Sequence, residues 1–240
     1  MKFKDKIVFV SGGTGELGQS VVRRFLSEGA QVVTSYLSEA EKEKFKHAIQ
    51  EFQPRVEFFK ANLVKENEVE AAFFFIKERF HQLDILCNVV GGYMEKTQLT
   101  NLAERDWDFM MDLNLKSCFF CTKHGLRLMQ ERNEGRIINV SAMAGLTPEG
   151  GRGAYGISKG AVALLTKIAA TEAKSDSKSR ITVNAIAPSI LATSSNQGWA
   201  STEEMASWVT LEQATDTITY LASEEASAIN GQIIGVYGRK

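Results

Sequence analysis

The chain has 240 residues, 44% of them hydrophobic and 24% charged, so it can bury one substantial core, and we expect a single domain over residues 1–240. Its formal net charge of -1 and dispersed basic residues argue against nucleic acid or an anionic membrane surface as a partner. The sequence has neither an apolar run of bilayer length nor a signal peptide, so we expect a cytoplasmic protein.

Short apolar runs alternate with helix-length amphipathic runs from end to end. The runs that predict strands are Ile7–Val10, Gln31–Ser35, Val56–Lys60, Ile85–Val89, Arg136–Val140, Ile181–Ile186 and Gln232–Val236. This alternation is typical of a parallel sheet with helices on both faces. The expected fold class is therefore α/β, with a doubly wound parallel sheet of seven strands.

Four residue pairs indicate where helices begin, because each places a capping side chain three residues before Glu or Gln. They are Ser38 with Glu41, Asn101 with Glu104, Ser201 with Glu204, and Thr210 with Gln213. In the helix expected over 66–80, the stripe Val69, Ala72, Phe73, Ile76 and Phe80 faces the core. Phe74 and Phe75 point elsewhere, either under a neighbouring loop or into a subunit contact.

Helical stretches 106–129 and 153–173 are apolar on more than one side, which favours a homodimer or homotetramer. Cys118 and Cys121 form a CxxC pair inside this apolar pattern, and Cys87 is the third cysteine. Because no second pair exists, we expect reduced cysteines that pack in the core, and no metal site.

The segment from Ile7 to Gly18 reads as a buried strand, a glycine-rich turn and the start of a helix. Glycines at 12, 15 and 18 let the backbone approach a pyrophosphate, with the helix N-terminus directed at it. A tight strand-to-helix turn without a ligand has the same pattern. Its place in the first strand–helix unit favours nucleotide binding.

Tyr155 and Lys159 lie four residues apart at the start of a predicted helix, and therefore on one face of it. The Lys159 ammonium can lie beside the Tyr155 phenol and favour its ionised form. A phenol whose pKa falls below its usual value of about 10 can donate and accept a proton near neutral pH. The pair therefore predicts acid–base chemistry.

These motifs, taken in order, resemble the short-chain dehydrogenase/reductase family over essentially the whole chain. The resemblance rests on the glycine-rich turn, on Asn88 and Gly91 after the fourth strand, and on Asn114. It also rests on the strand ending at Ser141, on Tyr155 with Lys159, on the segment 184–193 and on the closing strand 231–238. It implies a Rossmann-like fold and reversible hydride transfer between a nicotinamide dinucleotide and a carbonyl or alcohol carbon.

The resemblance also assigns roles to single residues. Gly12, Thr14, Gly15, Leu17 and Gly18 would hold the pyrophosphate, Asn62 and Leu63 the adenine, and Asn88, followed by Gly91, the adenosine ribose. Lys159 would hold the nicotinamide ribose, with Pro188, Ile190 and Thr193 around the nicotinamide. Tyr155 would act as general acid in reduction and general base in oxidation, and Asn114 would relay protons from Lys159 to solvent.

The chain departs from the family pattern at several positions, beginning with Val89 and Val90 in the turn after the fourth strand. Glu16 stands where the family has its middle glycine, and Ser189 follows Pro188 in place of a glycine. Tyr36 takes the place of the carboxylate that selects NAD, which favours NADP slightly, although no arginine lies nearby and Glu16 would oppose a phosphate. The expected cofactor is therefore NADP or NAD.

The usual catalytic serine position falls on Ala142, one residue after Ser141. Ser141 could replace it only if a local bulge turns its side chain inward; otherwise its hydroxyl bonds to backbone. Alanine at this position is similar to the dihydropteridine-reductase-like branch of the family, whose substrate is quinonoid. We keep Ser141 as a candidate catalytic residue.

We interpret the chain as an NAD(P)-dependent oxidoreductase that acts on a small carbonyl, alcohol or quinonoid substrate. The substrate loop is expected at about 189–207, with Trp199 inside it and Trp208 next to it. The alternative is a dinucleotide-binding, redox-sensing or partner-binding protein with little turnover, for which Ala142, Glu16 and the Phe74–Phe75 pair argue.

Overall fold

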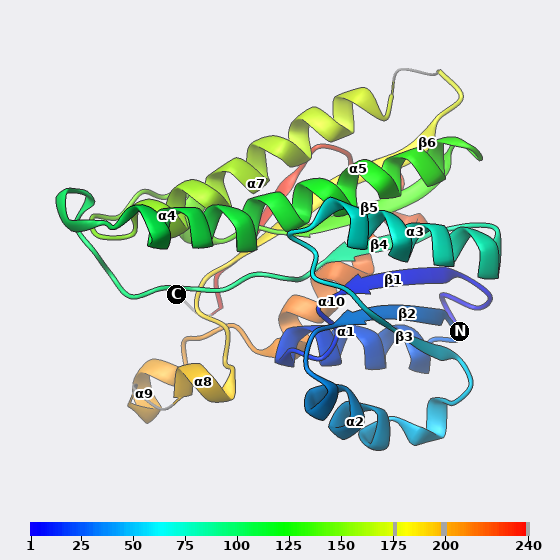
Figure 1. Cartoon of the computed structure of the whole chain (residues 1–240), viewed down its shortest axis with the longest axis horizontal. Helices are drawn as coiled ribbons and strands as arrows, with labels where there is room; N and C mark the ends of the chain where they lie inside the picture. The colour runs from blue at the N-terminus through cyan, green and yellow to red at the C-terminus, as the bar shows by residue number, and fades with distance from the viewer. Residues whose placement is uncertain (175–176, 198–200, 239–240) are drawn as a thin grey trace.

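A computed structural model describes residues 1–174, 177–197 and 201–238. Within them, seven strands form one parallel sheet in the order β3-β2-β1-β4-β5-β6-β7 (Figure 1). The strands are β1 (Ile7–Ser11), β2 (Gln31–Tyr36), β3 (Val56–Lys60), β4 (Ile85–Asn88), β5 (Glu134–Val140), β6 (Arg180–Pro188) and β7 (Ile233–Val236). The predicted doubly wound α/β sheet is confirmed, and every strand end lies within two residues of its expected place.

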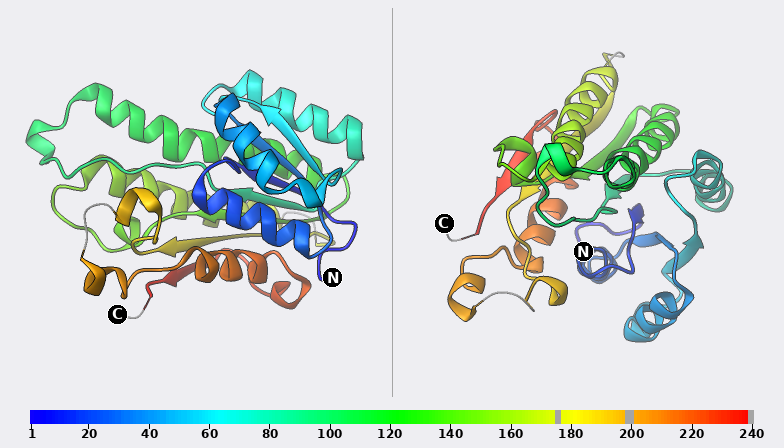
Figure 2. Two further views of the ribbon diagram at one scale, coloured as in Figure 1. Left: turned by 90° about the horizontal axis from the view of Figure 1, so that it is seen from below. Right: turned by 60° about the vertical axis from the view of Figure 1, so that its left-hand side comes forward.

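Helices cover both faces of this sheet, with α1 and α10 on one and α3, α5 and α7 on the other (Figure 2). The helices are α1 (Glu16–Ser27), α2 (Glu39–Ala48), α3 (Glu66–Phe80), α4 (Glu104–Met110), α5 (Ser117–Gln130), α6 (Met143–Leu146), α7 (Gly153–Glu172), α8 (Ser194–Gln197), α9 (Thr202–Met205) and α10 (Leu211–Leu221). Short 3-10 turns lie at η1 (Gln50–Phe52), η2 (Leu99–Asn101) and η4 (Glu224–Ala226). A π-helical turn, η3 (Met111–Lys116), joins α4 to α5.

Two hydrophobic cores lie on opposite faces of the sheet, and β1 contributes to both. Val8 and Val10 pack with α1 and α10, whereas Ile7 and Phe9 pack with α3 and α5. Successive side chains of a strand point to opposite faces, so a strand that is covered on both sides must be apolar throughout. This explains why the predicted strands are continuous apolar runs without alternation.

Two of the four predicted helix starts are confirmed by hydrogen bonds. Ser38 accepts the Glu41 amide at 3.3 Å, and Thr210 forms a complete capping box with Gln213. Helix α9 begins one residue after Ser201, as expected. The prediction for Asn101 is wrong, because this residue belongs to η2 and α4 begins after Ala103.

The predicted core stripe of α3 is confirmed: Val69, Ala72, Phe73 and Ile76 are buried, and Phe80 is half-buried against the same core. The two remaining phenylalanines differ. Phe75 packs against Phe59 of β3 with ring centroids 5.4 Å apart, whereas the Phe74 side chain is exposed.

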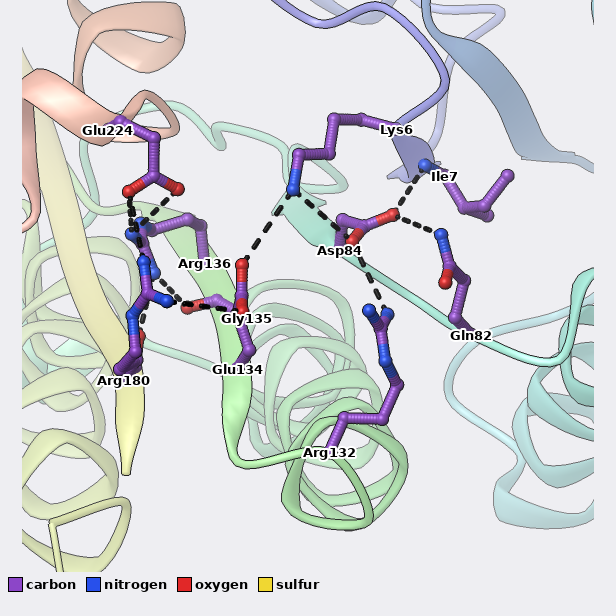
Figure 3. A network of polar contacts seen from close by, with 10 residues as sticks. All are labelled: Lys6, Ile7, Gln82, Asp84, Arg132, Glu134, Gly135, Arg136, Arg180 and Glu224. Atoms are coloured by element: carbon purple, nitrogen blue, oxygen red, sulfur yellow. Dashed lines mark hydrogen bonds and ion pairs between the residues drawn. The ribbon is translucent and has the colours of Figure 1, made fainter. Parts of the chain in front are cut away.

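The amino ends of the central strands carry a network of charged residues (Figure 3). Buried Asp84, just before β4, accepts the Ile7 amide at 2.8 Å and pairs with Lys6 and Arg132. Buried Arg136 of β5 pairs with Glu224 at 3.2 Å. These ion pairs connect the residues at the amino ends of β1, β4 and β5 to one another and to neighbouring segments. No helix in the described ranges is both long and apolar enough to cross a membrane.

The carboxyl ends of β1 and β4 lie side by side at the centre of the sheet, where the strand order reverses. The connections after these two strands leave in opposite directions and open a crevice between them. The functional residues predicted from the sequence converge on this end.

Candidate active site

A cleft of about 960 Å³ runs along the carboxyl ends of the strands. Its walls come from the turn after β1, the ends of β2 and β3, the segments after β4, β5 and β6, and the start of α7. Most predicted site residues line it: Gly12, Thr14, Gly15, Leu17, Gly18, Tyr36, Asn62, Leu63, Gly91, Ser141, Tyr155, Lys159, Pro188, Ile190 and Thr193. One continuous cleft thus joins the glycine-rich turn to the Tyr155–Lys159 pair.

The turn after β1 is compact because two of its glycines approach other backbone closely. Gly12 has φ +67°, and a Cβ on Gly18 would lie 2.2 Å from the Gly12 carbonyl oxygen. The Gly12 amide donates to the Ser35 hydroxyl at 2.9 Å. Helix α1 starts directly after Gly15, so its N-terminal amides face the cleft. The turn forms the backbone cradle that a pyrophosphate requires.

Glu16, at the position of the family's middle glycine, lines the cleft and is also bound by a residue from a distant segment. Its carboxylate accepts hydrogen bonds from both the amide and the hydroxyl of Ser194, each at 2.8 Å. Ser194 begins α8, in the expected substrate loop. The Glu16–Ser194 bridge therefore joins the glycine-rich turn to that loop, which sequence reasoning did not anticipate.

Both cations and carboxylates surround the end of β2. The Tyr36 hydroxyl donates to Glu39 at 3.1 Å, and the Lys42 ammonium lies 5.1 Å from the Tyr36 ring centroid. Hydrogen bonds from Lys42, and then from Lys60 and Tyr36, lower the pKa of the Glu39 carboxyl to about 2. Glu41 also lines the cleft and accepts the Thr14 hydroxyl at 3.4 Å.

Asn88, expected at the adenosine ribose, is buried behind the wall of the cleft. Its Nδ2 donates to Asn139 at 2.8 Å and to Thr122 at 3.1 Å. The next two residues, Val89 and Val90, form the wall instead. The Asn88 side chain therefore links β4 to α5 and β5, and its contact with an adenosine ribose stays a prediction.

Helix α7 holds Tyr155 and Lys159 one turn apart, as their spacing predicts. Its first turns press against α6 because both helices use glycine at the contact: a Cβ on Gly145 would lie 2.5 Å from the Gly160 nitrogen. The Lys159 ammonium is buried and donates to the Val140 carbonyl at 3.0 Å. Close backbone packing thus fixes both side chains against the end of β5.

The ionisation of this pair differs from the prediction. Burial raises the pKa of the Tyr155 phenol to about 12, and Arg152 opposes this shift only in part. Burial also lowers the pKa of the Lys159 ammonium to about 8. The expected fall of the Tyr155 pKa below 10 is therefore wrong for the protein alone, because desolvation outweighs nearby positive charge.

Asn114 lies in the π-helical turn and does not reach the cleft surface. Its side chain accepts the Gly92 amide at 2.8 Å and donates to the Gly92 carbonyl and to the Ser158 hydroxyl, each at 3.1 Å. A Cβ on Gly91 would lie 2.7 Å from the Lys159 ammonium and 2.8 Å from Asn114 Oδ1. Asn114 therefore ties the segment after β4 to α7 beside Lys159.

Ser141 and Ala142 lie where β5 gives way to α6. The buried Ser141 hydroxyl donates to the Lys159 carbonyl at 2.7 Å, which is the backbone-bonding alternative stated above. Ala142 follows in extended conformation and lines the cleft with a methyl group.

Tyr93, Glu149 and Arg152 also line the cleft near Tyr155, and sequence reasoning missed all three. The Tyr93 ring meets the Tyr155 ring edge to face, with centroids 5.1 Å apart and an 85° interplanar angle. The Arg152 guanidinium lies 5.6 Å from the Tyr93 centroid on a ring face. The only local signal was the position of Arg152 three residues before Tyr155.

Among the described residues, the remaining sequence candidates do not line the cleft. Cys87, Cys118 and Cys121 are buried and free, and burial raises their pKa values. Residues 1–174, 177–197 and 201–238 contain no group of acidic, cysteine and histidine side chains that could hold a metal ion. In and beside the substrate loop, Trp208 is buried, and Trp199 lies outside the described residues.

Comparison with known proteins agrees with this arrangement. Residues 6–204 match a family model described as short chain dehydrogenase. The chain is 31% identical to a 3beta-hydroxysteroid dehydrogenase from Mediterraneibacter gnavus, with 99% of this chain and 95% of that protein covered. It is 32% identical to 3-oxoacyl-acyl-carrier-protein reductase FabG from Staphylococcus aureus, with 97% of each covered.

Among solved structures, ElxO with NADP bound superimposes with a TM-score of 0.90 at 27% identity, over 97% of each chain. Its bound cofactor shows that a closely similar fold holds a nicotinamide dinucleotide.

Proposed function

The chain belongs to the short-chain dehydrogenase/reductase family, and from that premise we propose that it transfers hydride between a nicotinamide dinucleotide and a small carbonyl, alcohol or quinonoid substrate, with Tyr155 moving the proton. Family membership itself makes the protein an NAD(P)-dependent oxidoreductase. One observation carries the proposal: the glycine-rich turn and the Tyr155–Lys159 pair line the same cleft.

The residues of the cleft fit such a cofactor. The Gly12–Gly18 backbone would hold the pyrophosphate, Asn62 and Leu63 the adenine, and Pro188, Ile190 and Thr193 the nicotinamide. When bound, the cofactor supplies or accepts the hydride. Lys159 would hold the nicotinamide ribose from its buried place next to Val140.

Tyr155 would donate the proton when the substrate is reduced. With a pKa of about 12, the phenol carries its proton throughout the neutral range, so the donor form is the resting form. The reverse reaction needs the phenolate, which burial disfavours. Oxidation would therefore require positive charge nearby to stabilise the phenolate, from Lys159 and from the oxidised nicotinamide.

Lys159 and Asn114 would replace the proton that Tyr155 gives up. A pKa of about 8 leaves the Lys159 ammonium mostly protonated at neutral pH and able to release a proton. Asn114 lies in a π-helical turn, a distortion that is frequent at functional sites, and it fixes Gly92 beside Lys159. We place the proton relay along this route to solvent.

For Ser141, we propose a positioning role, since its hydroxyl is committed to the Lys159 carbonyl of α7. Ala142 then leaves the substrate oxygen without the usual hydroxyl donor, whose loss in comparable sites costs about 3–4 kcal/mol of transition-state stabilisation. Substrates with an already electrophilic carbon, such as quinonoid or activated carbonyl compounds, are favoured by this geometry.

The cofactor preference is proposed to be NADP by a small margin. Position 36 carries tyrosine rather than a carboxylate, and Lys42 and Lys60 lie close to it. Glu41 in the wall opposes a phosphate. Titration of both cofactors tests this preference, and NAD binding ten times tighter than NADP would refute it.

We also propose that the protein is a homodimer or homotetramer. Ile157, Leu164 and Ile168 are exposed and share one face of α7, and Phe109 and Phe119 are exposed on α4 and α5 beside it. A twofold axis would pack this helix face against its own copy. Sedimentation of wild type and Leu164→Glu tests this, with dissociation of the variant expected.

The decisive experiment measures NADPH and NADH oxidation by wild type and Tyr155→Phe with ketones, 3-oxoacyl thioesters, diketones and quinonoid acceptors. We expect turnover that the variant loses while it still binds cofactor. Turnover confined to quinonoid acceptors would make Ala142 the defining residue. Tight cofactor binding without any turnover would favour the alternative, a redox-sensing or partner-binding protein, for which the exposed Phe74 is a possible contact.

A further inference from the structure

Three charged residues gather at the mouth of the cleft, next to the expected proton donor. Glu149 forms an ion pair with Lys96, and its other oxygen lies 2.6 Å from Arg152 Nε. Two cations therefore share one carboxylate. The group carries one positive charge in excess, in a cleft whose cofactor end is lined by the acidic Glu16 and Glu41.

Glu149 contacts the Arg152 guanidinium at one nitrogen only, Nε. The Nε–Glu149 contact is close but lacks the alignment of a hydrogen bond, and Nε is buried. Among the described residues, the two terminal nitrogens of the Arg152 guanidinium have no hydrogen-bond partner. These nitrogens carry the paired N–H donors that bind a carboxylate in bidentate fashion.

The plane of this guanidinium is fixed by Tyr93. Arg152 lies over one face of the Tyr93 ring, and Tyr155 meets the same ring edge to face. The side chain thus keeps its orientation while its N–H groups stay free. Only one aromatic ring separates it from the group that would protonate the substrate.

From this arrangement we propose that Arg152 anchors a carboxylate of the substrate, so that the enzyme acts on a short oxo acid or the matching hydroxy acid. The substrate carboxylate binds the two terminal nitrogens of Arg152, while Glu149 stays at Nε and keeps Lys96 as its second partner. The carbonyl of the same molecule then lies at Tyr155. This inference rests on the proposed hydride transfer and names its substrate class.

The other charged and titratable groups near Arg152 do not remove its charge. They are Glu149, Lys96, Lys159, Tyr93 and Tyr155, and Glu149 is the single carboxylate among them. Lys159 is buried against Val140 and adds positive charge on the inner side. Around Arg152 the cations Lys96, Arg152 and Lys159 thus outnumber the single carboxylate of Glu149.

The test compares an oxo acid with its own neutral ester, for example levulinate with methyl levulinate, and other linear oxo acids that separate the two groups differently. We expect wild type to reduce the best acid about tenfold more efficiently in kcat/KM than its ester, a difference of about 1.4 kcal/mol. Arg152→Gln should remove this preference by lowering activity on the acid alone. Glu149→Gln should enlarge it, because Arg152 loses a neighbouring negative charge.

Arg105→Gln provides the matched control. Arg105 belongs to α4, its side chain is largely exposed, and it does not line the cleft. This variant should keep the full preference for the acid. Raising the salt concentration from 0.05 to 0.5 M should weaken the preference of wild type only in part, because a partly buried pair is incompletely screened.

Two results would overturn the inference: equal use of acid and ester by wild type, or an equal loss on both in Arg152→Gln. Absence of hydride transfer to every acceptor, neutral ones included, would instead refute the proposed function. In that case calorimetry with pentanoate and methyl pentanoate still decides. Binding of pentanoate that Arg152→Gln loses supports the anchor, and absence of pentanoate binding rejects it.

Discussion

Buried charged side chains have ionic partners at one end of the parallel sheet but not at the other. At the amino ends, Asp84 accepts a backbone amide and pairs with Lys6 and Arg132, and Arg136 pairs with Glu224 (Figure 3). At the carboxyl ends, the buried Lys159 has a carbonyl as partner and, among the described residues, no carboxylate.

The pKa values of Lys159 and Tyr155 reflect this lack of ionic partners at the carboxyl ends. Burial lowers the pKa of Lys159 to about 8 and raises that of Tyr155 to about 12, so both groups resist charge where they stand. A group that is not stabilised by fixed partners remains available to a ligand. We infer that the amino end contributes stability, whereas the carboxyl end holds reactive groups at a cost in stability.

Replacing Lys159 by Met should give the largest effect and separate the two properties. Turnover should fall about 10³-fold, because the proposed ribose contact and the proposed proton source are both lost. The melting temperature should rise by a few degrees, since a buried unpaired cation is removed. Calorimetry and NADPH oxidation measure the two effects.

The gain in stability should depend on pH with a definite sign. The Lys159 pKa is lower in the folded protein than the ordinary 10.5, so its charge destabilises the fold below about pH 8. This cost disappears as the pH rises toward 10.5, where the unfolded chain also loses the proton. The difference between wild type and Lys159→Met should shrink over the same range, and a constant difference would contradict the argument.

Replacing Asp84 by Ala should have the opposite effect. The Ile7 amide and two cations lose their buried acceptor, which should lower the free energy of unfolding by about 3 kcal/mol. The kcat of the folded enzyme should stay within about twofold. Glu225→Ala, which removes an exposed ion pair with Lys2, is the control and should leave the free energy of unfolding nearly unchanged.

The pH profile of wild-type reduction should separate Lys159 from Tyr155. If the Lys159 cation is needed, kcat/KM falls about tenfold per pH unit above pH 8, because the ammonium loses its proton there. If only Tyr155 matters, activity persists to much higher pH, since its pKa is about 12. Pre-steady-state hydride transfer, followed over pH 6–10, distinguishes these outcomes.

The smallest effect is expected at Glu16. Glu16→Gly removes a carboxylate from the phosphate cradle and should tighten cofactor binding about threefold. Glu16→Gln keeps an acceptor for Ser194 but removes the charge. If charge is the cause, both variants tighten binding equally; if the bridge matters more, only Glu16→Gly changes the affinity.

Local sequence patterns sufficed for much of the fold. Continuous apolar runs predicted all seven strands because a strand buried on both faces leaves no other pattern. Ser38 and Thr210 were predictable as caps, since their partners lie three residues away. Asn101 was not, because Leu99–Asn101 forms a 3-10 turn that the capping pattern does not reveal.

The site was predictable where its residues are close in sequence. The spacing of Tyr155 and Lys159 placed both on one face of α7, and the glycine pattern placed the cradle. The Glu16–Ser194 bridge joins residues 178 positions apart, and no local pattern reports such a contact. The raised pKa of Tyr155 depends on the depth of burial, which becomes known only when the whole chain is folded.

The π-helical turn at Met111–Lys116 has a consequence for the geometry of the proposed dimer. A π turn holds one residue more than an α turn, and one residue corresponds to about 100° of helical rotation. The inserted residue therefore sets the angle between Phe109, which precedes the turn, and Phe119, which follows it. The same turn holds Asn114 against Gly92. Deleting one residue here would rotate one aromatic side chain away from the other and would displace Asn114. The first change would alter the proposed dimer contact, and the second would alter the proposed proton relay.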